Sequence, residues 1–179
     1  MNPSDNFTNK LIGAFNLHGT KKVVLKGTNI LIEGEIEKHI YLIESGAVRV
    51  YYLTELQEKV IRVGYKGSII NSLSSFLKQT PSEFFVEAIR KTVLQVIDKS
   101  VFTKLVTSDA ESTQQYIHLL ETLITQQIDR EIDLLVTSPT ERLERVLHRS
   151  PHLFQEIPLK YIASYLRMQP ETLSRIRKS

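Results

Sequence analysis

The last segment of the chain is Ile157-Pro-Leu-Lys-Tyr-Ile-Ala-Ser-Tyr-Leu-Arg-Met-Gln-Pro-Glu-Thr-Leu-Ser-Arg-Ile-Arg-Lys-Ser179. It predicts two short helices joined by a tight turn. Apolar and aromatic side chains recur at helical spacing from about residue 158 to 166. Pro170 suits the first turn of a second helix, where its missing N–H costs nothing. This pattern is typical of a helix-turn-helix, whose second helix enters a DNA major groove. The alternative is the last helical hairpin of a bundle.

Two residues of this segment depart from the usual motif. Arg167 lies in the turn, where a glycine would adopt a left-handed conformation more easily. Gln169 occupies the expected N-cap, where Ser, Thr, Asp or Asn would cap better. Neither residue excludes the motif.

Basic charge is concentrated at this end of the chain. The whole sequence holds 23 Lys/Arg and 20 Asp/Glu, a formal net charge of +3. Residues 138–179 contain 8 of the basic and 4 of the acidic residues, which leaves 15 and 16 for residues 1–137. An excess of basic over acidic residues is expected in a nucleic-acid-binding region, where cations replace condensed counterions. A solvated surface with a chance imbalance is the alternative.

Composition excludes several kinds of site. There is no cysteine, so disulfides, thiolate metal sites and cysteine nucleophiles are absent. No apolar run approaches the ~20 residues that span a bilayer. The N-terminus lacks the basic and apolar regions of a signal peptide, so we expect a cytoplasmic protein with no membrane partner. We expect no metal or cofactor, because the histidines do not cluster: His18, His39, His118, His148 and His152.

Residues 21–97 predict an antiparallel barrel or sandwich. Runs rich in Val, Ile and Tyr occur at 22–25, 29–32, 39–43, 47–53, 58–63, 84–89 and 92–97. Short runs with regular glycine punctuation are typical of such folds. A short helix is expected before them, at about residues 5–16, and another near 101–106. The separating glycines are Gly27, Gly34, Gly46, Gly64 and Gly67.

A long helix is predicted from about residue 109 to 136. Its apolar residues are three and four apart, so they form one stripe. At 1.5 Å per residue the helix is roughly 40 Å long, longer than the small barrel before it. We therefore expect part of the stripe to pack on the same helix of a second copy. The alternative is that all of it packs on its own barrel. The expected interface residues are Ile117, Leu120, Ile124, Ile128 and Ile132.

The sequence Ser138-Pro-Thr-Glu141 is a strong helix start. Ser138 serves as N-cap, Pro139 takes the first helical position, and Glu141 completes a capping box. The helix is expected to end near Ser150, before a proline.

The glycine-marked string Gly27-x6-Gly34-x6-Tyr41-Leu-Ile-Glu-Ser-Gly46-Ala-Val-Arg-Val-Tyr resembles the β-roll of the cyclic-nucleotide-binding fold. A roll, a long helix and a C-terminal helix-turn-helix, in this order, are similar to the catabolite activator / fumarate–nitrate regulator (CRP/FNR) family of bacterial transcription factors. The resemblance implies an α+β chain with a roll domain at 1–108, a dimerisation helix at 109–137 and a helix-turn-helix domain at 138–179. It implies double-stranded DNA and a second copy as partners. RNA polymerase and an unidentified small-molecule effector are further partners that it allows.

Nucleotide-binding members of that family present a Glu to the ribose and an Arg to the cyclic phosphate. The resemblance aligns these positions with Ser72 and Ser82. A phosphate without its guanidinium loses a bidentate, charge-assisted pair, and Glu83 nearby would repel it. We therefore expect no response to cyclic AMP or cyclic GMP. The loop holds another small effector or none, and its remaining candidate residues are Leu73, Ser74, Ser75 and Thr80.

The resemblance assigns base contacts to Glu171 and Arg175, whose spacing of four puts them on one helix face. Arg suits guanine O6 and N7, and Glu can accept from cytosine N4. The alternative is a surface ion pair worth under ~1 kcal/mol. The residues expected to contact phosphates, which position the protein without specifying a sequence, are Thr172, Ser174, Arg177 and Lys178. The whole expected DNA-binding set is Gln169, Pro170, Glu171, Thr172, Ser174, Arg175, Arg177 and Lys178.

These patterns together predict a homodimeric, DNA-binding transcriptional regulator. The alternative is a sensor or protein-interaction module whose helix-turn-helix no longer binds DNA. An enzyme is disfavoured, because no nucleophile–base arrangement, metal-ligand cluster or phosphate-cradling glycine loop is present in the sequence.

Overall fold

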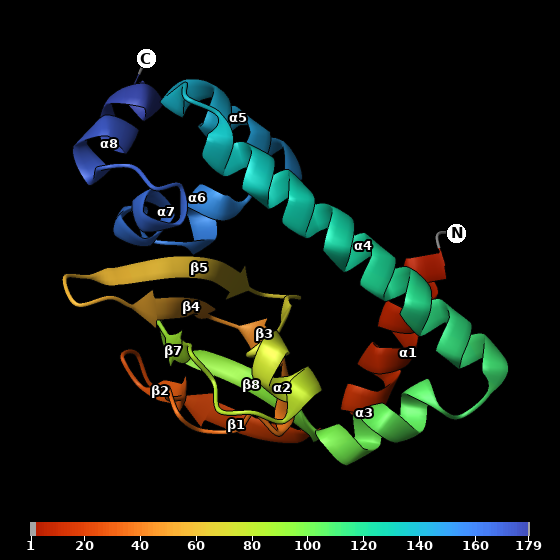
Figure 1. Ribbon diagram of the computed structural model, residues 1–179. Helices are drawn as coiled ribbons and strands as arrows, with labels where there is room; N and C mark the ends of the chain where they lie inside the picture. Colours follow the sequence, from red (N-terminus) through yellow and green to blue (C-terminus); the bar gives the residue numbers. More distant parts are fainter. Residues whose placement is uncertain (1–2, 179) are drawn as a thin grey trace.

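Two antiparallel four-stranded sheets form most of the N-terminal part of the chain (Figure 1). Helices lie along one side of these sheets, and further helices form the C-terminal part of the chain. The computed structural model describes residues 3–178. The strands are β1 (Thr20–Val24), β2 (Asn29–Leu31), β3 (His39–Ser45), β4 (Ala47–Leu53), β5 (Glu58–Tyr65), β6 (Ile69–Ile70), β7 (Phe85–Ala88) and β8 (Thr92–Asp98). The helices are α1 (Pro3–His18), α2 (Leu73–Lys78), α3 (Lys99–Val106), α4 (Ala110–Leu135), α5 (Pro139–Arg149), α6 (Leu153–Glu156), α7 (Leu159–Tyr165) and α8 (Pro170–Lys178).

The two sheets face each other across an apolar interior. Their strand orders are β1-β8-β3-β6 and β2-β7-β4-β5, with every pairing antiparallel. The predicted antiparallel fold and each of the seven predicted runs are thus confirmed. The two-residue strand β6 and the helix α2 were not predicted. The interior is formed by Val24, Leu31, Tyr41, Ile43, Val48, Val50, Ile70, Val86, Ala88 and Leu94.

The turn between β3 and β4 depends on a glycine. Gly46 has a φ of +86°, in the left-handed region, and a Cβ built there would lie 2.4 Å from the carbonyl oxygen of Lys91. Both the conformation and the space therefore exclude any side chain. The close approach brings the hydroxyl of Thr92 against the backbone of Ala47, to which it donates at 3.1 Å.

An aromatic cluster joins α4 to the roll. Phe7 of α1, Phe76 of α2, Phe102 of α3 and Tyr116 of α4 pack with ring centroids 5.4–6.1 Å apart. Such tilted and edge-on contacts are favoured by the ring quadrupoles. The N-terminal half of α4 is thus fixed to α1 and α3, while its C-terminal half extends toward α5, as Figure 1 shows.

The connection from α4 to α5 is held by polar contacts. Ser138 caps α5 as predicted, accepting the N–H of Glu141 at 3.3 Å. Asp133 of α4 is fully buried and is paired with Arg145, at 2.8 Å, and with Arg149. Because breaking a buried ion pair leaves an uncompensated charge, these contacts fix the direction in which α5 leaves α4.

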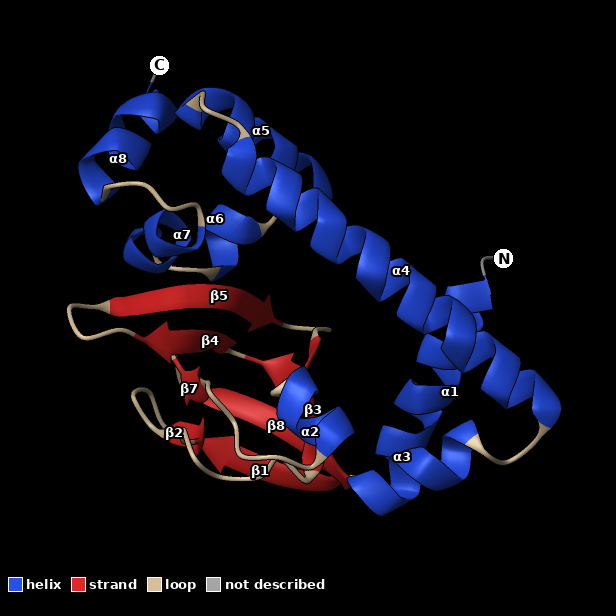
Figure 2. Cartoon of the chain, in the orientation of Figure 1, coloured by secondary structure: helices blue, strands red, loops and turns tan. Residues whose placement is uncertain are grey.

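Helix α7 packs on the outer strand β5, and α6 and α8 pack on α7, as Figure 2 shows. Val60 of β5 and Ile89 share one apolar cluster with Leu143, Ile162 and Leu173. The helical end of the chain and the roll therefore have a common core. Among residues 3–178, no helix is long and apolar enough to cross a membrane.

Candidate functional site

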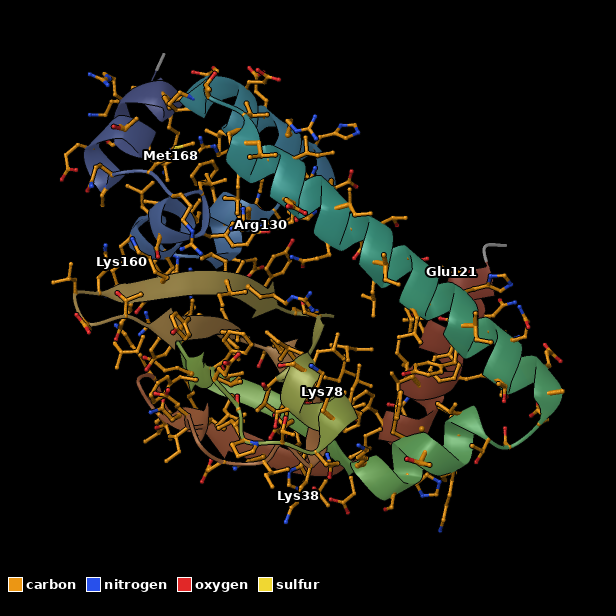
Figure 3. All side chains as sticks on the ribbon, viewed as in Figure 1. Lys38, Lys78, Glu121, Arg130, Lys160 and Met168 are labelled. Carbon is orange, nitrogen blue, oxygen red and sulfur yellow. The ribbon has the colours of Figure 1, made fainter. Side chains whose placement is uncertain are left out.

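The two helices predicted at the C-terminus form, and a tight turn joins them. Arg167 has a φ of +55°, so it adopts the left-handed conformation expected at this position. Its neighbour Met168, labelled in Figure 3, donates its N–H to the carbonyl of Ala163 at 2.9 Å and so closes the turn. Ala163, Leu166 and Leu173 are fully buried where α7 and α8 meet. The short side chain of Ala163 allows the close approach.

The outer face of α8 carries the residues predicted to contact DNA. Leu173 points inward, whereas Glu171 and Arg175 are both exposed and one helical turn apart. The acidic residue lies in the first turn and the basic residues lie in the last, which complements the helix dipole. Of the other predicted residues, Thr172 and Ser174 are half-buried, and Gln169, Pro170, Arg177 and Lys178 are exposed.

One predicted phosphate contact is also engaged within the chain. The guanidinium of Arg177 lies 5.3 Å from the ring centroid of Phe154 in α6. This cation–π contact holds the side chain against α6 and leaves α8 anchored at its C-terminal end.

The apolar stripe of α4 lies partly open to solvent. Ile124 is 60% exposed and Ile128 is 51% exposed. Ile117 and Ile132 are also exposed, whereas Leu120 is half-buried on the side of the roll. Packing of the whole stripe on its own barrel, the alternative above, is therefore not what this chain does.

The hydroxyls aligned with the nucleotide-binding positions bond to each other. Ser72 and Ser82 are buried, and their Oγ atoms are 2.8 Å apart. Ser82 also donates to the carbonyl of Phe84 at 2.9 Å. Ser75 is buried as well and donates to the carbonyl of Thr80 at 2.6 Å. Leu73 is half-buried, while Ser74, Thr80 and Glu83 are exposed, so the predicted effector residues do not converge on one open site.

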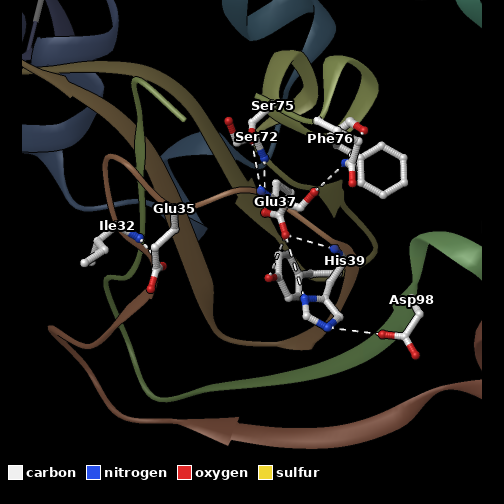
Figure 4. A network of polar contacts seen from close by, with 10 residues as sticks. Ile32, Glu35, Glu37, His39, Ser72, Ser75, Phe76 and Asp98 are labelled. Atoms are coloured by element: carbon white, nitrogen blue, oxygen red, sulfur yellow. Dashed lines mark hydrogen bonds and ion pairs between the residues drawn. The ribbon is translucent and has the colours of Figure 1, made fainter. Parts of the chain in front are cut away.

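A buried carboxylate occupies the same loop region, and the sequence analysis did not identify it. Glu37 is fully buried. Its Oε1 accepts the N–H of His39 at 3.0 Å and the hydroxyl of Tyr41 at 3.1 Å, and its Oε2 accepts the N–H of Ser72 at 3.5 Å (Figure 4). Burial raises the pKa of the Glu37 carboxyl, and the hydrogen bond from His39 opposes this. No sequence signal separates Glu37 from the exposed acidic residues beside it.

Comparisons with known proteins agree with this fold. Residues 21–109 match the family model of the cyclic nucleotide-binding domain. A comparison with curated protein sequences gave no match.

Solved structures resemble nearly the whole chain. The FixK2 protein of Bradyrhizobium japonicum is 20% identical, with a TM-score of 0.74 over 89% of this chain and 83% of that chain. The c-di-GMP-responsive global regulator CLP of Xanthomonas campestris is 16% identical, with a TM-score of 0.65 over 95% and 90%. The catabolite activator protein of Thermus thermophilus is 21% identical, with a TM-score of 0.57 over 95% and 81%. At these identities the likeness establishes the fold.

Proposed function

We propose that this chain is a homodimeric, DNA-binding transcriptional regulator of the CRP/FNR type that does not respond to cyclic AMP or cyclic GMP. The observation that carries the proposal is α8, whose exposed face presents Glu171 and Arg175 beside a basic C-terminal end. The similar structures support it, because two of them are named as a global regulator and a catabolite activator protein. In this proposal α7 and α8 are the helix-turn-helix and residues 138–179 are the DNA-binding domain.

Base contacts are assigned to one face of α8. A guanidinium at Arg175 can donate two parallel hydrogen bonds to guanine O6 and N7, and a carboxylate at Glu171 can accept from cytosine N4. Lys178 and the hydroxyls of Thr172 and Ser174 suit phosphate oxygens, which position the protein without reading sequence. Gln169 and Pro170 would lie at the entry of the helix into the groove.

The dimer is assigned to the exposed stripe of α4. Isolated exposed apolar residues are common on soluble proteins, but Ile124 and Ile128 belong to one continuous line on a helix. Packing this line against its two-fold copy removes it from water and leaves two copies of α8 in one particle. The two α8 helices would then enter successive major grooves, roughly 34 Å apart, of a near-palindromic DNA site.

The loop around residues 67–85 is proposed not to hold a cyclic phosphate. The Ser72 and Ser82 hydroxyls already bond to each other, and the Ser72 N–H faces the Glu37 carboxylate at 3.5 Å. A phosphate there would find the Ser72 N–H already directed at the Glu37 carboxyl and no guanidinium to pair with, which is unfavourable in a buried position. A titration that gave micromolar or tighter affinity for either cyclic nucleotide would disprove this part.

In vitro selection of bound DNA tests the main proposal. Enrichment of a two-fold symmetric motif with half-sites one helical turn apart supports it, and it tests DNA binding, symmetry and spacing together. Failure to enrich any sequence, by a protein shown to be folded and dimeric, favours the alternative of a sensor or interaction module without DNA binding. Recruitment of RNA polymerase would be tested afterwards, on the selected site.

A further inference from the structure

Two adjoining cavities lie between the roll and α4. The first, of about 240 Å³, is bordered by α1, α2, α3 and the N-terminal half of α4. The second, of about 360 Å³, lies beside it toward the middle of α4 and reaches Gln127. They share four lining residues, Arg62, Asn71, Leu73 and Leu77, so they form one groove with two ends.

The two ends of this groove differ in chemistry. The first end is lined mainly by apolar and aromatic side chains, among them Phe76, Phe102 and Leu119. The second end and the shared boundary add the polar side chains of Asn71, Ser74 and Gln127. An apolar body with a polar head is therefore the shape of molecule that fits.

An arginine lies where these ends meet. A bulge in β5 pairs Arg62 with Val50, and beyond the bulge Arg62 alternates with Gly64 on the same face of the strand. A Cβ at Gly64 would contact the side chains of Ile43 and Ile70 at 3.0 and 3.1 Å, so this face looks into the roll. Arg62 is thus a solvent-exposed cation on the inner face of β5, at the open edge of the roll and beside an apolar groove.

Within residues 3–178, the charge of Arg62 is not matched by any acidic partner. The described ion pairs and hydrogen bonds do not include Arg62, Asn71 or Gln127. The other arginine of the same sheet, Arg49, is paired with both Glu58 and Glu87. An anion entering the groove would supply what Arg62 lacks, in a charge-assisted hydrogen bond.

We propose that this groove binds a small amphipathic organic anion, with its carboxylate on Arg62 and its apolar body against Phe76, Phe102 and Leu119. The groove borders the closed polar pair of Ser72 and Ser82, because Ser72 lines its second end. The proposed ligand is a class of effector for the regulator proposed above. Its binding does not depend on that proposed function, but its role in regulation does. Because Leu119 and Gln127 belong to α4, the ligand would contact the helix that is proposed to join the two copies.

Calorimetric titration of the full chain with three probes tests the ligand class. Decanoate carries both the tail and the charge, decanol carries only the tail, and acetate carries only the charge. We expect saturable binding of one decanoate per chain, below its micellar concentration, and at least about tenfold weaker binding of each other probe, as a charged hydrogen bond and a buried tail both contribute. Equal affinity for decanol and decanoate, or decanoate uptake without saturation, overturns the proposal.

Substitutions locate the site. Arg62→Gln should weaken decanoate binding at least about tenfold, whereas Lys66→Gln, which removes an exposed charge just after the same strand, should leave it unchanged. Leu77→Glu provides a second variant, since Leu77 is 45% exposed and lines both cavities, and the new anion should repel decanoate. If Arg62 serves only to protect the edge of the sheet, Arg62→Gln binds decanoate like the parent chain and the proposal fails.

DNA binding is measured separately on the same proteins without decanoate. Arg62→Gln and Lys66→Gln should both select the same DNA as the parent chain, because neither residue belongs to α8. Decanoate binding that depends on Arg62, in a chain that selects no DNA, would leave the site standing and refute the regulator. Selection of DNA by a chain that does not bind decanoate would refute the ligand site and leave the regulator standing.

Discussion

The hydroxyl of Ser164 in α7 accepts a hydrogen bond from the backbone N–H of Val60 in β5, at 3.0 Å. Strand β5 is the outer strand of its sheet, so this N–H has no neighbouring strand to bond to. Beside it, the buried guanidinium of Arg49 lies between the rings of Tyr51 and Tyr161, 4.1 and 4.7 Å from their centroids. Helix α7, the first helix of the proposed helix-turn-helix, therefore covers the edge of the roll.

Ser164→Ala should lower the free energy of unfolding by about 1 kcal/mol, because the partly buried N–H of Val60 loses its acceptor. Urea unfolding measures this change. Ser174→Ala in α8 is the matched control, since no described contact uses its hydroxyl, and it should not lower stability. Equal stability of Ser164→Ala and the parent chain would mean that water replaces the hydroxyl and that the contact does not hold α7 on β5.

Regular features of this fold could be predicted from the sequence, and irregular ones could not. The strands of the roll, the long helix and the Ser138 cap each produce a local pattern of spacing or capping that physical rules recognise. Strand β6 and helix α2 are too short to show a period. Their positions depend on distant residues, since the N–H of Glu37 donates to the hydroxyl of Ser75 in α2, and Ile70 of β6 pairs with Tyr41.

The residues of the candidate site also include some that the sequence could predict and some that it could not. The exposed face of α8 follows from helical spacing alone, so Glu171 and Arg175 could be placed on it from the sequence. The roles of Glu37 and Arg62 could not, because each depends on what surrounds it. Glu37 is buried by α2, and Arg62 faces inward because a bulge shifts the alternation of β5 by one residue.

Arg175→Ala and Lys178→Ala separate base contacts from phosphate contacts. Arg175→Ala should cost roughly 1–3 kcal/mol on the selected site and relax the preference at one base pair. Lys178→Ala should weaken binding to all sequences about equally and reduce the salt dependence by about one counterion. Quantitative gel shifts on the selected site and on single-base variants, at several salt concentrations, measure both effects. An unchanged sequence preference in Arg175→Ala would refute its assignment to base contact.

Ile124→Glu should convert the proposed dimer to monomers. Burial of one isoleucine is worth roughly 1.5–3 kcal/mol, and a two-fold interface loses it twice. The dimer dissociation constant from analytical ultracentrifugation should therefore rise by at least about a hundredfold. Gln126→Glu adds the same charge at an exposed position outside the apolar stripe and should leave the constant nearly unchanged. A parent chain that is monomeric at high concentration would exclude the interface outright.

The buried carboxyl of Glu37 should make stability depend on pH. Burial raises its pKa in the folded chain above the ordinary value of 4.5. As pH rises through this window, the unfolded chain loses the proton first while the folded chain keeps it, so the free energy of unfolding decreases with rising pH. Nearby titratable groups are His39, whose Nδ1 lies 3.9 Å from the carboxylate, Tyr41, and Asp98, which pairs with His39.

Glu37→Gln replaces the titratable carboxyl by an amide. The decrease in the free energy of unfolding with rising pH should then disappear. The variant's free energy of unfolding relative to that of the parent chain should therefore increase as pH rises above about 4.5, the ordinary pKa of the carboxyl. Urea unfolding at several pH values measures the difference, and Glu83→Gln, at an exposed position of the neighbouring loop, should follow the parent curve. The opposite slope would mean that the donors of His39, Tyr41 and Ser72 stabilise the carboxylate more than burial destabilises it. In that case Glu37 is an anion in the folded chain, and it would also repel a cyclic phosphate by its charge.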